Sequence, residues 1–248
     1  MKLQLGSSLD DYINCGDETT RKLLKADGPL IQALKKCHDF FANTLWADTN
    51  DLSPIPALLS TNAFMLFLSG IRMAMTGHAS AIFPNLRTAL ESACYAFVMV
   101  QDSSTEQIWT DRHKDERGRR LCKQRFLSAV RDTANKLNEV QADSGDWIVE
   151  AYESAIDFGA HPNARSVFMH VSFGPDEEDG LQRVNLAGLY DSESPNTKSS
   201  LVACMDYGLA IAIVLTRCLK NPSSDIGAKL NELNEIKKRV TAGFGAVE

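Results

Sequence analysis

Two charged residues lie four positions apart within an otherwise apolar segment. Arg87 and Glu91 belong to residues 78–101, where most neighbouring side chains are small or apolar. In a helix this spacing places both side chains on one face, at the distance of an ion pair. One interpretation is a salt bridge at the edge of the core, which contributes little to stability. The other is a buried charged pair lining a pocket, because burying two charges is costly unless a function uses them.

A histidine and an asparagine follow the predicted end of a helix at Gly159. The sequence there is GAHPNAR, in which Pro162 fixes the backbone between His161 and Asn163. A histidine can transfer protons near neutral pH, and an asparagine can orient it or a substrate. In the alternative interpretation, Asn163 caps local backbone groups and His161 occupies a polar niche.

The strongest charge feature is a basic run over residues 111–131. It holds eight Lys or Arg against three acids, a local charge of +5, which leaves −11 on the rest of a chain of net charge −6. An exposed helix of this kind can neutralise phosphates, although such a run is most often a solvated face. Aromatic residues flank the run without interleaving it, so any nucleic-acid contact should be to backbone phosphate. The candidate binding residues of the run are Arg112, Arg117, Arg119, Arg120 and Lys123.

The composition is that of an ordinary folded protein. The chain has 248 residues, of which 44% are hydrophobic and 23% charged, with 15 Gly and 8 Pro. This balance excludes a disordered, collagen-like or low-complexity chain. The first residues include Asp10 and Asp11 and no long apolar stretch, so no export signal is expected. We therefore expect a cytoplasmic protein whose six widely spaced cysteines are reduced and buried.

No short motif identifies a reaction. The chain has no phosphate-binding glycine loop, no G-x-S-x-G elbow and no H-E-x-x-H pair. Its five histidines are not grouped with carboxylates at metal-ligand spacing, and no two cysteines have the spacing of a zinc site. We therefore expect neither a metal nor a cofactor.

Two strongly apolar stretches approach the composition of membrane spans. Residues 63–71 are too short and are followed by Arg72, whereas residues 201–216 are interrupted by Asp206 and Gly208. A span needs roughly 17–25 apolar residues, and a charge at bilayer depth is costly. We interpret both stretches as central helices of a soluble bundle and expect no membrane partner.

Apolar residues recur at helical spacing over most of the chain. Proline marks two helix starts, at Gly28-Pro29 and at Pro54, and Pro84 either kinks its helix or begins it. The predicted helices cover residues 30–46, 54–76, 78–101, 104–141, 145–158, 197–219 and 224–241.

One segment has the pattern of strands rather than helices. Residues 166–173 and 181–187 are rich in β-branched and aromatic side chains and flank an acidic turn, which favours a β-hairpin or a long ordered loop. Strands do not alternate with helices, so no parallel sheet is expected. We predict an all-α bundle of about seven helices, forming a single domain over residues 1–248 with a hairpin insertion at about 166–190.

The stretch GHASAIFPNLRTALE at residues 77–91 resembles a family of uncharacterised bacterial helical-bundle proteins. In that family an Arg and a Glu four apart precede a long basic helix and a short helix that ends in a His-containing turn. The resemblance covers about residues 55–170, and the family is similar to the HEPN superfamily of nucleotide-binding helical domains. Many HEPN members are metal-independent ribonucleases of toxin–antitoxin or antiviral systems. The matching residues are Arg87, Glu91, Arg125, Phe126, His161, Pro162 and Asn163.

HEPN ribonucleases carry an Arg four to six residues before a His. This spacing occurs twice here, at Arg72 and His78 and at Arg165 and His170. The second pair falls on the predicted first strand, and the first pair straddles a predicted helix end. The resemblance implies a homodimer that contacts RNA in a bacterial stress or defence system.

Two functions fit these observations. The preferred one is a non-catalytic binding module that holds a protein or small ligand through Arg87, Glu91 and His161 together with the hairpin. The alternative is a metal-independent ribonuclease. In it, His161 or His170 transfers the proton at the 2′-hydroxyl or the leaving oxygen, Arg165 or Arg87 stabilises the phosphorane, and the basic run holds the RNA. Both functions require these side chains to converge in space.

Overall fold

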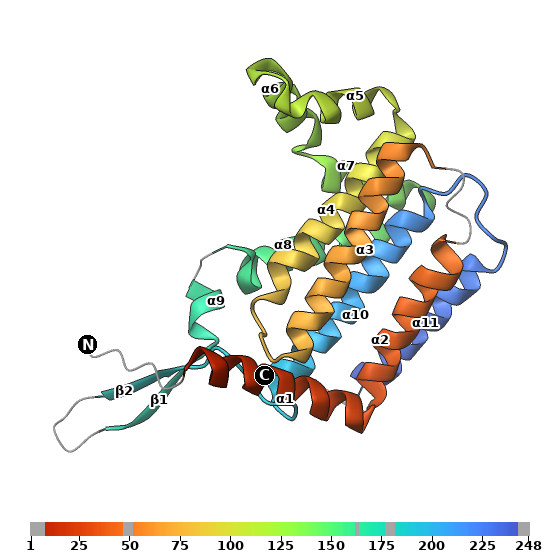
Figure 1. The fold of residues 1–248 in the computed structure, drawn as a ribbon. Coiled ribbons are helices and arrows are strands. Elements are labelled where there is room, and N and C mark those ends of the chain that lie inside the picture. Colours follow the sequence, from red (N-terminus) through yellow and green to blue (C-terminus); the bar gives the residue numbers. More distant parts are fainter. Residues whose placement is uncertain (1–7, 47–51, 162–163, 177–181, 243–248) are drawn as a thin grey trace.

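The structure, a computed structural model, describes residues 8–46, 52–161, 164–176 and 182–242 (Figure 1). Within these residues the chain forms eleven α-helices and one antiparallel two-stranded hairpin. The predicted all-α class with a small hairpin is confirmed. The number of α-helices exceeds the predicted seven by four, because the predicted helix over residues 104–141 is divided into three and because the first helix, over Leu9–Ala26, and a short helix over Ala164–Phe168 were not predicted.

The elements follow one another with short connections. The helices are α1 Leu9–Ala26, α2 Pro29–Phe40, α3 Pro54–Met75, α4 Ile82–Gln101, α5 Ser104–Thr110, α6 Glu116–Phe126, α7 Ala129–Val140, α8 Ser144–Ala155, α9 Ala164–Phe168, α10 Pro195–Thr216 and α11 Ile226–Thr241. The strands are β1 Val171–Asp176 and β2 Gln182–Leu186. Single helical turns of other types are η1 Phe41–Leu45, η3 Asp111–His113 and η4 Ile156–Ala160.

Three long helices form the centre of the bundle. α3, α4 and α10 lie side by side (Figure 1), and their contact faces bury side chains such as Phe67, Leu90 and Ile211 completely. Proline opens α3 and α10, where its missing N–H is tolerated and its fixed φ suits the first turn. By length and composition alone both helices could cross a membrane. In the bundle, 72% of the apolar window of α10 is buried, against 33% for α3.

The remaining helices surround this centre. α2 and α11 pack on α10 and on each other, and α7 and α8 pack on α4. α1 crosses one end of the bundle, and α5 and α6 extend beyond the opposite end (Figure 1). Five of the six cysteines are buried as predicted, whereas Cys15 on α1 is exposed.

The prediction of one long helix over residues 104–141 is wrong. The segment forms α5, η3, α6 and α7. Asp115 begins α6 by accepting a hydrogen bond from the backbone N–H of Gly118 at 2.6 Å, as an N-cap residue does. A Cβ at Gly118 would lie 2.2 Å from the carbonyl oxygen of Asp111, so only glycine permits this approach. α6 therefore packs back against η3, a contact that helical spacing alone does not indicate.

The hairpin projects away from the bundle (Figure 1) and has one apolar face. Val171 lies opposite Leu186 and Phe173 lies opposite Val184, so these four side chains share a face. Three of them, Phe173, Val184 and Leu186, are more than half exposed. An isolated two-stranded hairpin is marginally stable, and most of this apolar face is exposed.

The first strand begins later than predicted, because the short helix α9 occupies the start of that segment. Arg165 lies in α9, and the backbone N–H of His170 donates to the carbonyl of Val167 in a turn. Strand pairing follows directly, since the N–H of Ala187 donates to the carbonyl of His170 at 3.0 Å. The prediction that Arg165 and His170 fall on a strand is therefore wrong.

Candidate functional site

The structure brings Arg87, Glu91 and His161 together. The guanidinium of Arg87 donates from Nε to Glu91 Oε1 at 3.2 Å and from Nη1 to His161 Nε2 at 2.7 Å. Its third nitrogen, Nη2, donates to the hydroxyl of Tyr152 at 2.6 Å. We call these four residues the Arg87 cluster; they come from α4, from α8 and from the residue after η4.

The Arg87 cluster lies at the edge of the core. Leu86 and Leu90 beside it on α4 are fully buried, while the side chains of Arg87 and Glu91 are 20% and 30% exposed. The guanidinium also lies over the ring of Tyr152, with Cζ 4.7 Å from the ring centre. This position combines hydrogen bonding with a cation–π contact, which favours the charged form.

The surroundings of Arg87 favour its charged form. Burial acts to lower the pKa of Arg87, but the hydrogen bonds and charges of Tyr152 and Glu91 outweigh it, and the pKa is raised. Burial also raises the pKa of Tyr152, so the phenol stays protonated at neutral pH. Because a guanidinium only donates, Nε2 of His161 is an acceptor here and a neutral imidazole carries its proton on Nδ1. The cluster thus ties α4 to the end of the α8–η4 segment.

The other predicted catalytic residues lie elsewhere or are not described. Nδ1 of His170 is hydrogen-bonded to the hydroxyl of Tyr190 at 2.7 Å, beside the base of the hairpin. Burial lowers the pKa of His170, and its Nε2 has no hydrogen-bond partner among the described residues. Arg165 belongs to α9, and Asn163 lies outside the described residues.

The Arg72–His78 spacing does not form a paired site either. Arg72 donates to Asp17 on α1 at 3.0 Å. Nε2 of His78 is 2.6 Å from the hydroxyl of Tyr12, and Nδ1 is 2.7 Å from Oγ1 of Thr76. Burial lowers the pKa of His78. These bonds fasten α1 to the loop after α3.

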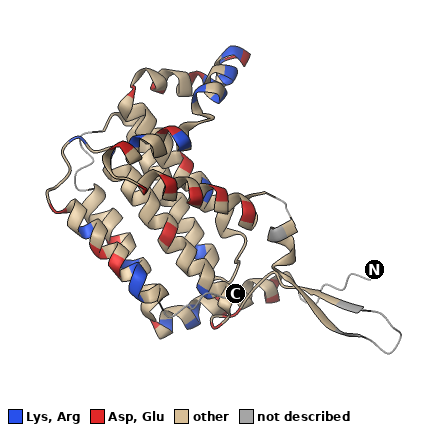
Figure 2. Ribbon diagram, turned by 180° about the vertical axis from the view of Figure 1, so that it is seen from behind, with Lys and Arg blue, Asp and Glu red and all other residues tan. Residues whose placement is uncertain are grey.

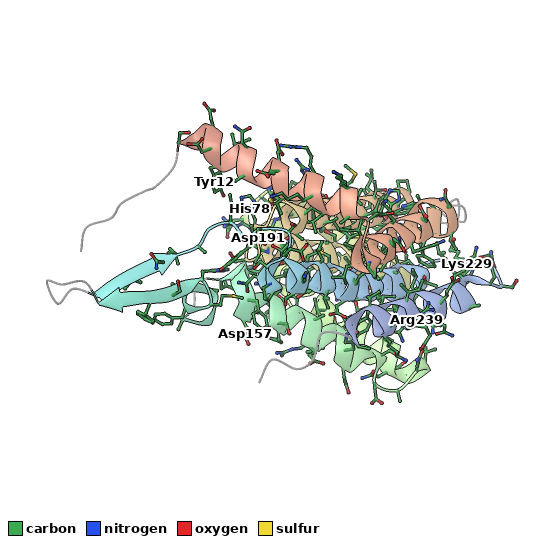
Figure 3. All side chains as sticks on the ribbon, turned by 90° about the horizontal axis from the view of Figure 1, so that it is seen from below. Tyr12, His78, Asp157, Asp191, Lys229 and Arg239 are labelled. Carbon is green, nitrogen blue, oxygen red and sulfur yellow. The ribbon has the colours of Figure 1, made fainter. Side chains whose placement is uncertain are left out.

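A pocket of about 430 Å³ adjoins this contact, between α1 and residues 188–191. Tyr12 lines it, together with Cys15 and Lys22 from α1 and Asp191 from the opposite segment. Figure 3 shows Tyr12, His78 and Asp191 close together at this end of the bundle. None of the charged side chains that line this pocket is buried, so the pocket offers little for chemistry on a ligand.

The predicted basic residues form a separate surface. Arg117, Arg119, Arg120 and Lys123 are exposed on α6, at the end of the molecule that α5 and α6 extend (Figure 2). Arg112 on η3 is exposed as well and approaches the sulfur of Cys122 at 4.0 Å. The binding candidates therefore divide between the Arg87 cluster and α6.

Sequence reasoning missed a second pocket. It has a volume of about 450 Å³ and is lined by residues of α4, α8, α10 and α11; we call it the α8–α10 pocket. Phe83, one turn before Arg87 on α4, stacks on Phe158 of η4 with ring centres 5.6 Å apart and forms one wall. The Arg87 cluster therefore holds in place the segment that carries this wall.

A charged pair also lines the α8–α10 pocket. Lys237 of α11 forms an ion pair with Asp206 of α10, and their side chains are 22% and 31% exposed. The ammonium also lies 5.5 Å from the ring centre of Trp147, which lines the pocket too. Nearby, Tyr207 donates its hydroxyl to the carbonyl of Ala151; burial and the charge of Asp206 raise its pKa. The pocket thus offers aromatic walls and one polarised end.

Comparison of the chain with family models, with curated proteins and with solved structures gives no match. The described residues contain no group of three or more His, Cys, Asp or Glu that could hold a metal ion. What the fold and site define is an all-α bundle with a preformed pocket and a separate basic surface.

Proposed function

We propose that this protein is a non-catalytic binding module that holds a small, largely apolar ligand in the α8–α10 pocket. A polar or anionic group of the ligand would meet the ion pair of Asp206 and Lys237. The observation that carries the proposal is the pocket itself, because its volume of about 450 Å³ falls in the range of small-molecule sites. Such sites combine apolar and aromatic walls with a few polar groups that fix orientation.

The hydrogen bonds of the Arg87 cluster favour this function over catalysis. All three nitrogens of Arg87 donate to protein groups, and Nε2 of His161 accepts one of these bonds. A guanidinium fixed in this way links helices, with three of its five N–H groups engaged within the protein. The cluster therefore supports the pocket wall through the η4 segment, which carries Phe158.

A fluorescent probe tests the proposal. Anilinonaphthalene sulfonate pairs an aromatic body with an anionic group, so we expect one molecule to bind the folded protein with increased emission. Ala203→Phe fills part of the pocket and should weaken binding on the order of tenfold. Lys237→Met removes the cation and should weaken it several-fold.

The adjacent residue of α11 provides a matched control. Lys238 is exposed, forms an ion pair with Glu235 and does not line the pocket, so Lys238→Met should bind the probe like the unchanged protein. Circular dichroism melting would establish that each variant is folded. Probe binding that is equal in Ala203→Phe, Lys237→Met and Lys238→Met would overturn the proposal.

A further inference from the structure

One face of α6 carries a row of cationic side chains that are exposed to solvent. Arg117, Arg120 and Lys123 are spaced three residues apart and exposed. Their opposite face, formed by Gly118, Cys122 and Phe126, is buried. Because α6 extends beyond the end of the bundle (Figures 1 and 2), a partner can approach the cationic face from solvent. We call Arg117, Arg120 and Lys123 the α6 row.

The acids near α6 are already engaged. Glu116 pairs with Arg119 at 3.8 Å, and Asp115 caps the N-terminus of the helix through Gly118. Asp111 accepts a hydrogen bond from Gln107 at 2.8 Å. Among the residues that the structure describes, no carboxylate forms an ion pair with any member of the α6 row. Three positive charges thus remain uncompensated on a chain whose net charge is −6.

The orientation of α6 distinguishes between kinds of anionic partner. A helix that lies on a membrane surface buries a broad apolar face among the lipids. In α6 most of that face is used inside the protein, where Cys122 and Phe126 are 1% and 4% exposed and Phe126 contacts Tyr95 with ring centres 4.5 Å apart. Of the large apolar side chains of α6, Leu121 alone is exposed, at 42%, which is no broad apolar face. The solvent face keeps cations at a regular spacing, which suits a regular row of phosphates.

From this geometry we infer that the α6 row binds the phosphodiester backbone of nucleic acid, without base specificity. The row spans about 9 Å along the helix axis at 1.5 Å per residue. Over this length, each of the three cations can neutralise one phosphate of a flexible single strand. No aromatic side chain lies within the row, so base stacking adds nothing to sequence preference. This site is separate from the α8–α10 pocket, and each can fail without the other.

The experiment measures binding of a labelled oligothymidylate of about 20 nucleotides by fluorescence anisotropy at several salt concentrations. DNA lacks the 2′-hydroxyl, so binding is measured apart from any ribonuclease reaction. Each neutralised phosphate contributes about 0.7 to the slope of log affinity against log salt for a single strand. Replacing all three residues of the α6 row by Gln should lower the slope by about 2 and weaken binding at least tenfold at about 50 mM salt.

A second triple variant is the matched control. Arg21, Lys25 and Lys36 are exposed on α1 and α2 and, like the α6 row, form no ion pair with a described carboxylate. Changing these three to Gln alters the net charge equally, so it should leave the salt slope within about 0.5 of the original. The α6 variant should also keep its binding of anilinonaphthalene sulfonate, which shows that the fold and the pocket persist.

Three results would overturn the inference. The first is equal weakening by both triple variants, which would mean that overall charge governs binding. The second is an affinity for the oligonucleotide that does not depend on salt. The third is binding to vesicles of phosphatidylcholine and phosphatidylserine that depends on the α6 row, with no binding to the oligonucleotide, which would assign the row to a membrane surface.

Discussion

Removing the guanidinium at position 87 should destabilise the fold far more than an ordinary surface salt bridge would. In Arg87→Met, three charge-assisted hydrogen bonds are lost, and Glu91 and Tyr152 lose a partner at partly buried positions. Each such bond contributes about 1.5–3 kcal/mol when it is fully made in the interior. Because the Arg87 side chain is 20% exposed, water can replace some of the lost hydrogen bonds. We therefore expect the free energy of unfolding to fall by about 3 kcal/mol.

Urea unfolding followed by circular dichroism measures this loss. With a slope of about 3 kcal/mol per molar urea for a chain of this size, the midpoint should fall by about 1 M. Arg131→Met is the matched control, since the Arg131 side chain is 75% exposed and meets Glu153 only at 4.0 Å. At this exposed helical position, the same Arg→Met substitution should lower the free energy of unfolding by less than about 0.5 kcal/mol.

The double variant Arg87→Met with Glu91→Leu refines the test. Replacing both partners by apolar groups leaves no unpaired charge, so part of the lost stability should return. The reasoning is refuted if Arg87→Met costs no more than Arg131→Met. In that case the Arg87 cluster would be a solvated salt bridge, and it could not support the wall of the α8–α10 pocket.

Two further predictions concern the contacts at the end of the bundle that α1 crosses. Burial lowers the pKa of His78 and His170 below the usual 6.5. Near pH 6.5 these histidines therefore bind more protons in the unfolded chain than in the folded protein. The free energy of unfolding should therefore fall as the pH drops from about 7 through 6.5. Urea unfolding should show a smaller fall over the same pH range in the double variant His78→Gln with His170→Gln. Gly77 has φ +81°, and a Cβ there would lie 2.1 Å from the carbonyl oxygen of Tyr190. Gly77→Ala should cost about 2 kcal/mol or more, whereas Gly227→Ala, with no atom near its Cβ, should be neutral or stabilise α11 by up to about 1 kcal/mol.

The central helices could be predicted because their signals are local. Pro54 opens α3 as the sequence indicates, and Pro84 lies in the first turn of α4, which confirms that the helix begins near it. The division of residues 104–141 could not be predicted in the same way. It depends on the close approach of Gly118 to Asp111, and such a contact is set by tertiary structure.

The candidate site was likewise predictable only in part, because local spacing could be read from the sequence and tertiary contacts could not. The pairing of Arg87 with Glu91 follows from helical spacing, whereas the contact of Arg87 with His161 depends on how the turn after η4 packs against α4. Tyr152 gave no signal of its own, although its position on the helix over residues 145–158 was predicted. The α8–α10 pocket left no trace in the sequence, because four helices contribute to it and no two lining charges are near one another along the chain.

The partners of a cation, more than its type, decide what it can bind. Three of the five N–H groups of Arg87 already donate within the protein, which fixes the guanidinium in one orientation and limits the directions from which a ligand can reach it. Lys237 has one carboxylate partner and a rotatable ammonium with three protons, so it can keep Asp206 and still donate to a ligand. The α6 row has no such partner among the described residues and needs to give up only hydration and bound counterions. An anionic group of a small ligand should therefore meet Lys237 in the pocket, while a chain of phosphates should meet the α6 row.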